Sequence, residues 1–388
     1  MDGLFRMFTR WRYRLLAAAQ LFFLFVRADR FFRTAATPPL APPPKGKGDA
    51  TNTVEQVCST APLPLGGGAG GGAKRLRHYF FGTMYLGAVF SRLRGRALDG
   101  LEMQRFANLA ALASYFDDLV DAAPPPPPPP EGRGDVTSPI SIKQESNHSE
   151  SSVSRLPSPP GEGSGLETYG HQADPSGLAL QLLHQAYADV PNIHAEAFRA
   201  HLLRVFHLET NGHQRSLKPP PTDEIARLTA EKGGCSVLLF RYLLGHELSN
   251  AERLALFEFG HLVQLCDDIF DLWHDRQNGT ATLATTWAEH GDLERLEACF
   301  EQQVAAVEAA FRNIQIPAGH RESAVQTAYF LVAVTRVCLR HYRCLQKKHG
   351  TLPLENRRAM VVDMARWKFR LRVVVEFFAH CTPLKSTP

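Results

Sequence analysis

Two clusters of aspartate residues place the strongest constraint on how this chain can fold. The first, DDLVD, covers residues 117–121, and the second, DDIFDLWHD, covers residues 267–275, each within an otherwise apolar stretch. Aspartate is a poor residue for a helix interior and is almost never buried without a partner. Two such clusters that face a core therefore need a compensating charge, and a divalent cation is the most economical candidate.

The spacing of these carboxylates favours a metal site. Residues four apart lie on one face of a helix, so Asp117 and Asp121 project together. The same spacing gives a stripe of three carboxylates from Asp267, Asp271 and Asp275. Oxygen ligands suit Mg²⁺, which keeps several waters and completes its octahedral shell with substrate phosphates. Two facing carboxylate walls would hold metal ions that bind a diphosphate. The alternative is that each motif is a solvated acidic end of a helix. This alternative explains a single motif better than it explains two.

Composition sets limits on the rest of the protein. Hydrophobic residues make up 44% of the 388 residues, enough for a sizeable core, while 27 prolines and 29 glycines indicate long irregular stretches. The net charge of +4 is small and the basic residues are scattered, so no nucleic-acid partner is expected. The seven cysteines form no CxxC pair or zinc spacing, which is typical of reduced thiols and favours a cytoplasmic protein.

Low-complexity segments divide the chain. Residues 34–73 are rich in proline and glycine and predict a flexible linker. Residues 123–173 form a Pro/Ser-rich insert that we expect to be disordered. The insert interrupts one domain over residues 74–380, which is followed by a short tail, residues 381–388.

The N-terminal segment, residues 1–33, combines arginines with an apolar run over residues 15–26. The run is too short to span a bilayer comfortably, and no convincing signal-peptidase site follows it. We expect a helix over residues 8–33 that packs on the domain. Peripheral contact with a membrane surface is the alternative.

The remaining sequence has helical periodicity. Ser249 and Glu252 form a capping box before a long apolar-periodic run. No sustained two-residue alternation with hairpin turns occurs, so strands are not expected. The predicted fold is all-α, a single large bundle of roughly ten or more helices. The predicted helices cover residues 74–95, 99–122, 175–189, 193–217, 222–246, 249–277, 281–290, 292–314, 320–348 and 355–380.

These motifs resemble those of the class I isoprenoid synthase superfamily, which contains the trans-prenyl diphosphate synthases and the class I terpene synthases. EKGGCSVLLFRYLLG, from residue 231, is similar to their lysine-containing helix, and FEFGHLVQLCDDIFDLWHD, from residue 257, to their second acidic helix. GTATL, from residue 279, takes the place of a GKPT-like turn, and GGAKRLRHYF, from residue 71, looks like a GGKRxRP segment. The resemblance touches most of residues 74–380 and implies a bundle around a central active-site cavity.

The resemblance also implies roles for individual residues. Two Mg²⁺ ions would be bound by the first motif and a third by the second, through Asp117, Asp118, Asp121, Asp267, Asp271 and Asp275. Asp268 belongs to the same catalytic set. Gln264 would lie beside the second motif, and Lys232 would contact the diphosphate. A second substrate's diphosphate would lie near Lys74, Arg75 and Arg77. Together, these metal ions and basic residues would neutralise the negative charge that develops on the departing diphosphate.

The chain departs from the prenyl synthases directly after the first motif. Where they carry an Arg-Arg-Gly segment, Ala122, Ala123 and a run of prolines follow Asp121. This difference favours a Mg²⁺-dependent terpene synthase that ionises a linear prenyl diphosphate and rearranges or cyclises the allylic cation. The alternatives are a trans-prenyl diphosphate synthase, which condenses isopentenyl diphosphate with an allylic diphosphate, and a non-catalytic helical partner subunit. A homodimer is compatible with each of them.

A further pattern bears on the choice between the two enzymes. Terpene synthases carry an Arg-Tyr pair near the C-terminus, and RHYR over residues 340–343 is a loose candidate for that pair. A polar helix face is the simpler explanation of these four residues.

Overall fold

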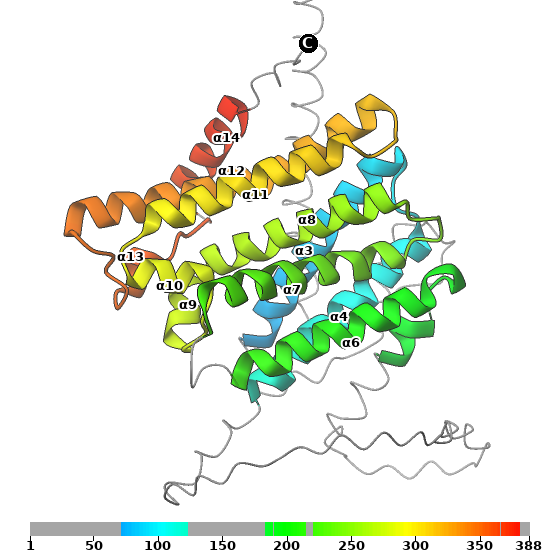
Figure 1. The fold of residues 1–388 in the computed structure, drawn as a ribbon, viewed down its shortest axis with the longest axis horizontal. Helices are drawn as coiled ribbons and strands as arrows, with labels where there is room; N and C mark the ends of the chain where they lie inside the picture. The colour runs from blue at the N-terminus through cyan, green and yellow to red at the C-terminus, as the bar shows by residue number, and fades with distance from the viewer. Residues whose placement is uncertain (1–70, 123–182, 189, 215–219, 365, 381–388) are drawn as a thin grey trace, which may run out of the picture.

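The computed structural model describes residues 71–122, 183–188, 190–214, 220–364 and 366–380 (Figure 1). The predicted N-terminal helix, the insert 123–173, the C-terminal tail and nearly all of the linker 34–73 lie outside these ranges. The side chains of residues 71–81, 117–122 and 210–214 also lie outside the description. Every regular element in the described residues is a helix, which confirms the predicted all-α class.

Most predicted helices are present with small changes at their ends. The helices of the described part are η1 (Asn192–His194), α3 (Gly71–Arg94), α4 (Gly100–Ala122), α6 (Ala195–Gln214), α7 (Thr222–Tyr242), α8 (Asn250–Phe270), α9 (Leu272–Gln277), α10 (Leu283–Glu289), α11 (Leu293–Arg312), α12 (Ala318–His349), α13 (Arg357–Met360) and α14 (Trp367–His380). Residues 183–188 are also helical.

Two predicted helices are each divided in the structure. Residues 249–277 were expected to form one helix, but α8 ends at Phe270 and α9 begins after Asp271, whose φ and ψ are −93° and 11°. Residues 355–380 contain the short α13, and then an extended Val361 with ψ of 118° separates it from α14. The β-branched Val361–Val362 pair disfavours the helix at that point.

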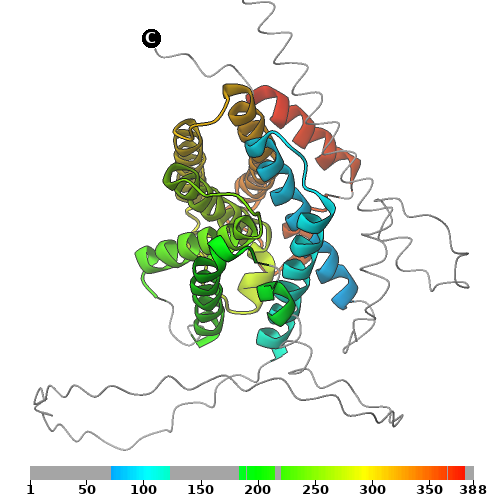
Figure 2. The same ribbon diagram turned by 90° about the vertical axis from the view of Figure 1, so that its right-hand side faces the viewer.

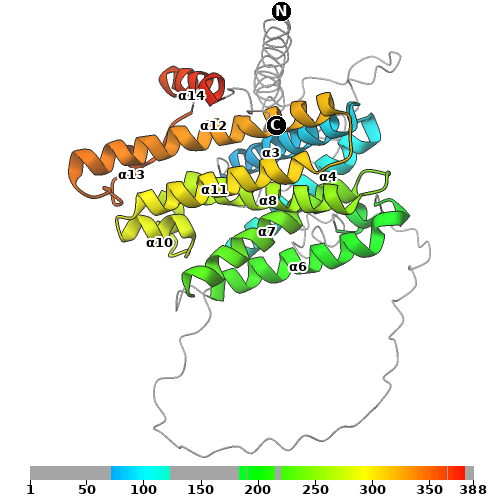
Figure 3. The same cartoon turned by 45° about the horizontal axis from the view of Figure 1, so that its top comes forward.

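Helix α8 lies at the centre of the bundle. Its buried residues, which include Leu256, Phe259, Leu262 and Leu265, point in several directions around the helix, as expected for a helix enclosed by others. It packs against α7, α11, α12 and α10 (Figures 1 and 2). Helix α3 packs on α4 and α12, and α14 lies on the outer side of α12 (Figure 3).

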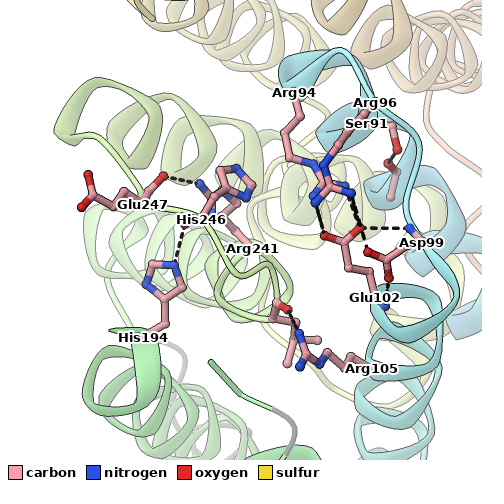
Figure 4. Close-up of polar contacts among 12 residues, drawn as sticks. Ser91, Arg94, Arg96, Asp99, Glu102, Arg105, His194, Arg241, His246 and Glu247 are labelled. Atoms are coloured by element: carbon pink, nitrogen blue, oxygen red, sulfur yellow. Dashed lines mark hydrogen bonds and ion pairs between the residues drawn. The ribbon is translucent and has the colours of Figure 1, made fainter. Parts of the chain in front are cut away.

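A polar network fixes one end of the bundle (Figure 4). Arg241, which has no exposed surface, pairs with Glu252 at 2.6 Å and donates to the carbonyl oxygens of His246 and Glu247. Ser249 caps α8 by accepting a hydrogen bond from the backbone N–H of Glu252. The structure thus confirms the Ser249 half of the predicted capping box. The carboxylate of Glu252 instead binds Arg241, so α7 is tied to the start of α8.

The loop between α3 and α4 reaches the same end. The carboxylate of Glu102 accepts hydrogen bonds from Arg94 at 2.6 Å and from Arg96 at 2.8 Å. Arg105, one turn further along α4, donates to the carbonyl oxygen of Leu243 at 3.1 Å. The start of α4 therefore lies beside the α7–α8 loop (Figure 4).

The start of α6 completes this end, because His194 lies 2.9 Å from the carbonyl oxygen of His246. Helices α4, α6 and α8 run from here to the opposite end of the bundle, and α7 runs in the reverse direction (Figure 1). The ends of α4 and α8, which carry the two acidic motifs, are thus found at the same end, and α3 begins there too. No helix within the described ranges is long and apolar enough to cross a membrane.

Candidate functional site

A close crossing of α7 and α8 brings the site's central residues together. A Cβ built on Gly233 would lie 2.1 Å from the carbonyl oxygen of Gly260, and one built on Gly260 would lie 2.2 Å from the carbonyl oxygen of Gly233. No side chain fits at either position, so the two backbones touch. Lys232 precedes Gly233 on α7, and the Cβ of Gln264 on α8 would lie 2.7 Å from a Cβ built on Gly233.

The crossing gives a stability prediction. We expect Gly260→Ala to lower the free energy of unfolding by about 3 kcal/mol, because backbone atoms of α7 would have to move to admit the new methyl group. Gly82→Ala on α3 is the control, since nothing lies within 4 Å of its Cβ. That change should stabilise the protein by about 0.5–1 kcal/mol through helix propensity. Urea unfolding of both variants measures the difference, and equal effects would contradict a tight crossing.

Asp268 is the buried carboxylate of the second motif. Gln264 donates to it at 2.9 Å, and Thr229 on α7 donates at 3.3 Å. Gln264 also donates to Asp267 at 3.4 Å, so one amide orients both carboxylates. Burial raises the pKa of Asp268 to about 7, and the neighbouring charge of Asp267 adds to the rise, while the Gln264 hydrogen bond and Lys232 oppose it.

The stripe predicted from Asp267, Asp271 and Asp275 keeps its spacing across the helix break. The backbone N–H of Asp271 still donates to Asp267 at 2.9 Å, and that of Asp275 to Asp271 at 2.8 Å. Asp267 and Asp275 are half-buried, whereas Asp271 is exposed. Burial raises the pKa of Asp275 to about 8, and repulsion from Asp268, Asp271 and Asp267 contributes further. The four carboxylates therefore interact as one cluster.

The charge of Lys232 acts on this cluster and lowers the pKa of both Asp268 and Asp275 against the larger effect of burial. Its Nζ lies 2.9 Å from the carboxylate of Glu209 on α6. Burial alone would lower the pKa of Lys232, but the charges of Glu209, Asp267 and Asp268 outweigh burial and raise it above the ordinary value. Lys232 is therefore charged at neutral pH. Sequence reasoning missed Glu209, because no local pattern shows that α6 lies against this part of α7.

The first acidic motif is placed by its backbone and by the residue before it. The ring of Phe116, on α4, meets that of Phe206, on α6, with centroids 4.8 Å apart. Phe206 lies one turn before Glu209, so the end of α4 approaches the part of α6 that binds Lys232. The side chains of Asp117, Asp118 and Asp121 lie outside the description.

The predicted second-substrate residues lie at the start of α3. Lys74, Arg75 and Arg77 are in the first two turns of that helix, at the same end of the bundle as both acidic motifs (Figure 1). Their side chains are also outside the description, so the structure places these residues only by their backbone.

The candidate Arg-Tyr pair divides between two sides of α12. Tyr342 is buried and donates to the carbonyl oxygen of Ile269 on α8 at 3.1 Å, next to the second motif. Arg340 instead pairs with Glu376 on α14, and Arg343 with Glu297 on α11. Only the tyrosine reaches the acidic helix, so the structure gives the candidate pair no shared site.

The carboxylate oxygens among the described residues suit a divalent cation, but these residues alone do not surround one. Within the described side chains, no three His, Cys, Asp or Glu residues gather in a metal-binding group. Burial, together with repulsion from the other three aspartates of the second motif, nevertheless raises the pKa of Asp275. Such an oxygen-rich set suits Mg²⁺, which takes carboxylates from more than one element together with phosphate oxygens. Asp267, Asp271 and Asp275 would form one side of that site.

A pH dependence follows from the two raised pKa values. Asp268 and Asp275 hold protons in the folded protein to about pH 7 and 8, whereas they lose them near 3.8 when unfolded. The folded state binds more protons between these limits, so stability without metal should fall as pH rises through this window. Asp268→Asn should flatten part of that slope, and the exposed Asp223→Asn should not. Thermal melts across a pH series measure how stability changes with pH in each variant. The same pH dependence in both variants would contradict the raised pKa assigned to Asp268.

Comparison of the chain with protein-family models, with curated proteins and with solved structures finds no match.

Proposed function

We propose that the protein is a Mg²⁺-dependent class I isoprenoid synthase, and that it acts as a terpene synthase on a linear prenyl diphosphate. The observation that carries the proposal is the grouping of Lys232 and Gln264 with four interacting aspartates. This group lies at the end of the bundle where α4, with the first acidic motif, also ends. Cations and carboxylates arranged in this way suit a ligand that carries both phosphate and metal.

The chain's own residues have separable tasks in this mechanism. Mg²⁺, when bound, would neutralise the charge that develops on the leaving diphosphate. Lys232 would donate a charge-assisted hydrogen bond to a diphosphate oxygen, in exchange for its contact with Glu209. Gln264 holds Asp267 and Asp268 in place from the same helix. The buried Thr229 satisfies a second oxygen of Asp268, which keeps this carboxylate turned into the α7–α8 crossing.

A trans-prenyl diphosphate synthase is the second candidate. The feature that favours it is the position of Lys74, Arg75 and Arg77 on the first turns of α3, at the same end as both acidic motifs. The sequence after Asp121 favours the terpene synthase, because it lacks the Arg-Arg-Gly segment. A non-catalytic subunit is the weakest candidate, since four repelling carboxylates would reduce stability without serving any reaction. The described cysteines are free, and the cytoplasm remains the compartment that we propose.

Turnover assays separate these candidates. The purified full chain is incubated with geranyl, farnesyl or geranylgeranyl diphosphate and Mg²⁺, with and without labelled isopentenyl diphosphate. We expect diphosphate release and a hydrocarbon or alcohol product without isopentenyl diphosphate. Label in a longer prenyl diphosphate would instead assign the prenyl synthase. Release equal to that of a chain-free blank in every mixture would contradict both enzymes.

A further inference from the structure

Helix α14 presents an apolar face to solvent. Trp367 is 67% exposed, Leu371 52% and Val375 59%, and Val374 is exposed beside them. With 3.6 residues per turn, these four side chains fall on one side of the helix. The opposite side, with Val373 and Phe377, packs on Ala333 and Val337 of α12. The exposed face is therefore a second apolar surface, in addition to the one that attaches the helix to the domain.

Basic side chains flank this face. Lys368 and Arg372 lie along one edge of it and Arg370 along the other, and all three are exposed. The wider segment, residues 357–372, carries six basic residues and one acidic residue, Asp363, which pairs with Arg366. The single acidic residue of α14, Glu376, is buried and pairs with Arg340. An occupant of this face must therefore be apolar at its centre and negatively charged around it.

Charge argues against two occupants that the chain itself could supply, a second copy of the chain and residues 1–33. A second copy of the chain would bring the same basic residues against these, and like charges at a contact repel each other. Residues 1–33 carry seven arginines and two aspartates, so they too have the wrong sign. A tryptophan and aliphatic residues between lysine and arginine side chains are typical of helices that lie in the interface of an anionic bilayer.

We propose that α14 is a membrane-docking helix, which lies in the headgroup region of an anionic lipid bilayer and holds the protein on the membrane surface. Trp367, Leu371, Val374 and Val375 enter the boundary with the acyl chains, while Lys368, Arg370 and Arg372 contact lipid phosphates. Helix α14 lies on the outside of α12 (Figure 3), so the rest of the bundle stays in water. This inference does not depend on the proposed enzymatic activity.

Vesicle sedimentation with the full chain tests the proposal. The probes are vesicles of phosphatidylcholine alone and of phosphatidylcholine mixed with phosphatidylglycerol. We expect binding to the mixed vesicles that weakens with salt, and little binding to phosphatidylcholine. Lys368→Gln with Leu371→Gln should lower the partition coefficient by about tenfold or more. The matched control is Arg199→Gln with Leu254→Gln, which removes the same charge and an equally exposed leucine from α6 and α8.

The control variant should bind mixed vesicles like the unchanged protein, and any contribution from residues 1–33 is the same in both variants. Three results would overturn the proposal. The first is no binding to mixed vesicles, and the second is an equal loss of vesicle binding in the α14 and control variants. The third is a dimer in lipid-free buffer that the α14 substitutions dissociate without changing vesicle binding. Diphosphate release in vesicle-free buffer should be the same in all three proteins, so a failure of the activity proposal can be recognised separately.

Discussion

Asp267→Asn should lower the rate of diphosphate release by about a thousandfold, which corresponds to ~4 kcal/mol of transition-state stabilisation. The substitution keeps the shape of the side chain but removes the charge of a carboxylate that we propose binds Mg²⁺. Folding should be retained, because removal of the Asp267 charge lowers the total electrostatic repulsion within the cluster.

Steady-state kinetics with the preferred prenyl diphosphate measure this effect. Glu196→Gln is the control, since it removes an exposed carboxylate from the first turn of α6, at the opposite end of the bundle. Its rate should stay within about twofold of the unchanged protein. A near-normal rate for Asp267→Asn at saturating Mg²⁺ would show that the second motif is a structural acidic cluster.

The largest stability effect should come from the other end of the bundle. Glu252→Ala leaves the guanidinium of the fully buried Arg241 without its carboxylate, although the carbonyl oxygens of His246 and Glu247 remain as acceptors. Breaking a buried ion pair by removing one partner costs about 3–5 kcal/mol. We expect a loss of that size in the free energy of unfolding, measured by urea titration.

Two further variants separate this effect from general loss of charge. Replacing both Arg241 and Glu252 by methionine should cost less than Glu252→Ala, because no unpaired charge stays buried. Glu224→Ala removes one of the two carboxylate partners of Arg227 in an exposed pair on α7 and should cost at most about 1 kcal/mol. Equal costs for Glu252→Ala and Glu224→Ala would contradict the role assigned to the buried pair.

Apolar periodicity in the sequence predicts the bundle well, because helices around the central α8, such as α11, bury one face. It could not predict the break at Asp271, where the helical hydrogen-bond ladder is interrupted although the N–H groups of Asp271 and Asp275 still donate to the residues four before them. The single helix predicted over residues 355–380 was likewise wrong, because the chain leaves the helical conformation at the β-branched residues Val361 and Val362.

The second acidic motif and its neighbour Gln264 could be picked out from the sequence, but the partners from other helices could not. Thr229 and Glu209 come from α7 and α6, and their contacts with Asp268 and Lys232 depend on how those helices pack. A signal for that packing was present in Gly233 and Gly234, since two adjacent glycines inside a helix indicate close approach of another backbone. The sequence alone does not say that Gly260 is the residue they meet.

We propose that the two acidic motifs form one site for Mg²⁺ and diphosphate. Isothermal calorimetry with inorganic diphosphate, in the presence and absence of Mg²⁺, measures this directly on the full chain and on its Asp117→Ala and Asp267→Ala variants. We expect tight binding only when both ligands are present, and at least about tenfold weaker binding in each variant. Mg²⁺-dependent diphosphate binding that either variant retains unchanged would contradict a site shared by the two motifs.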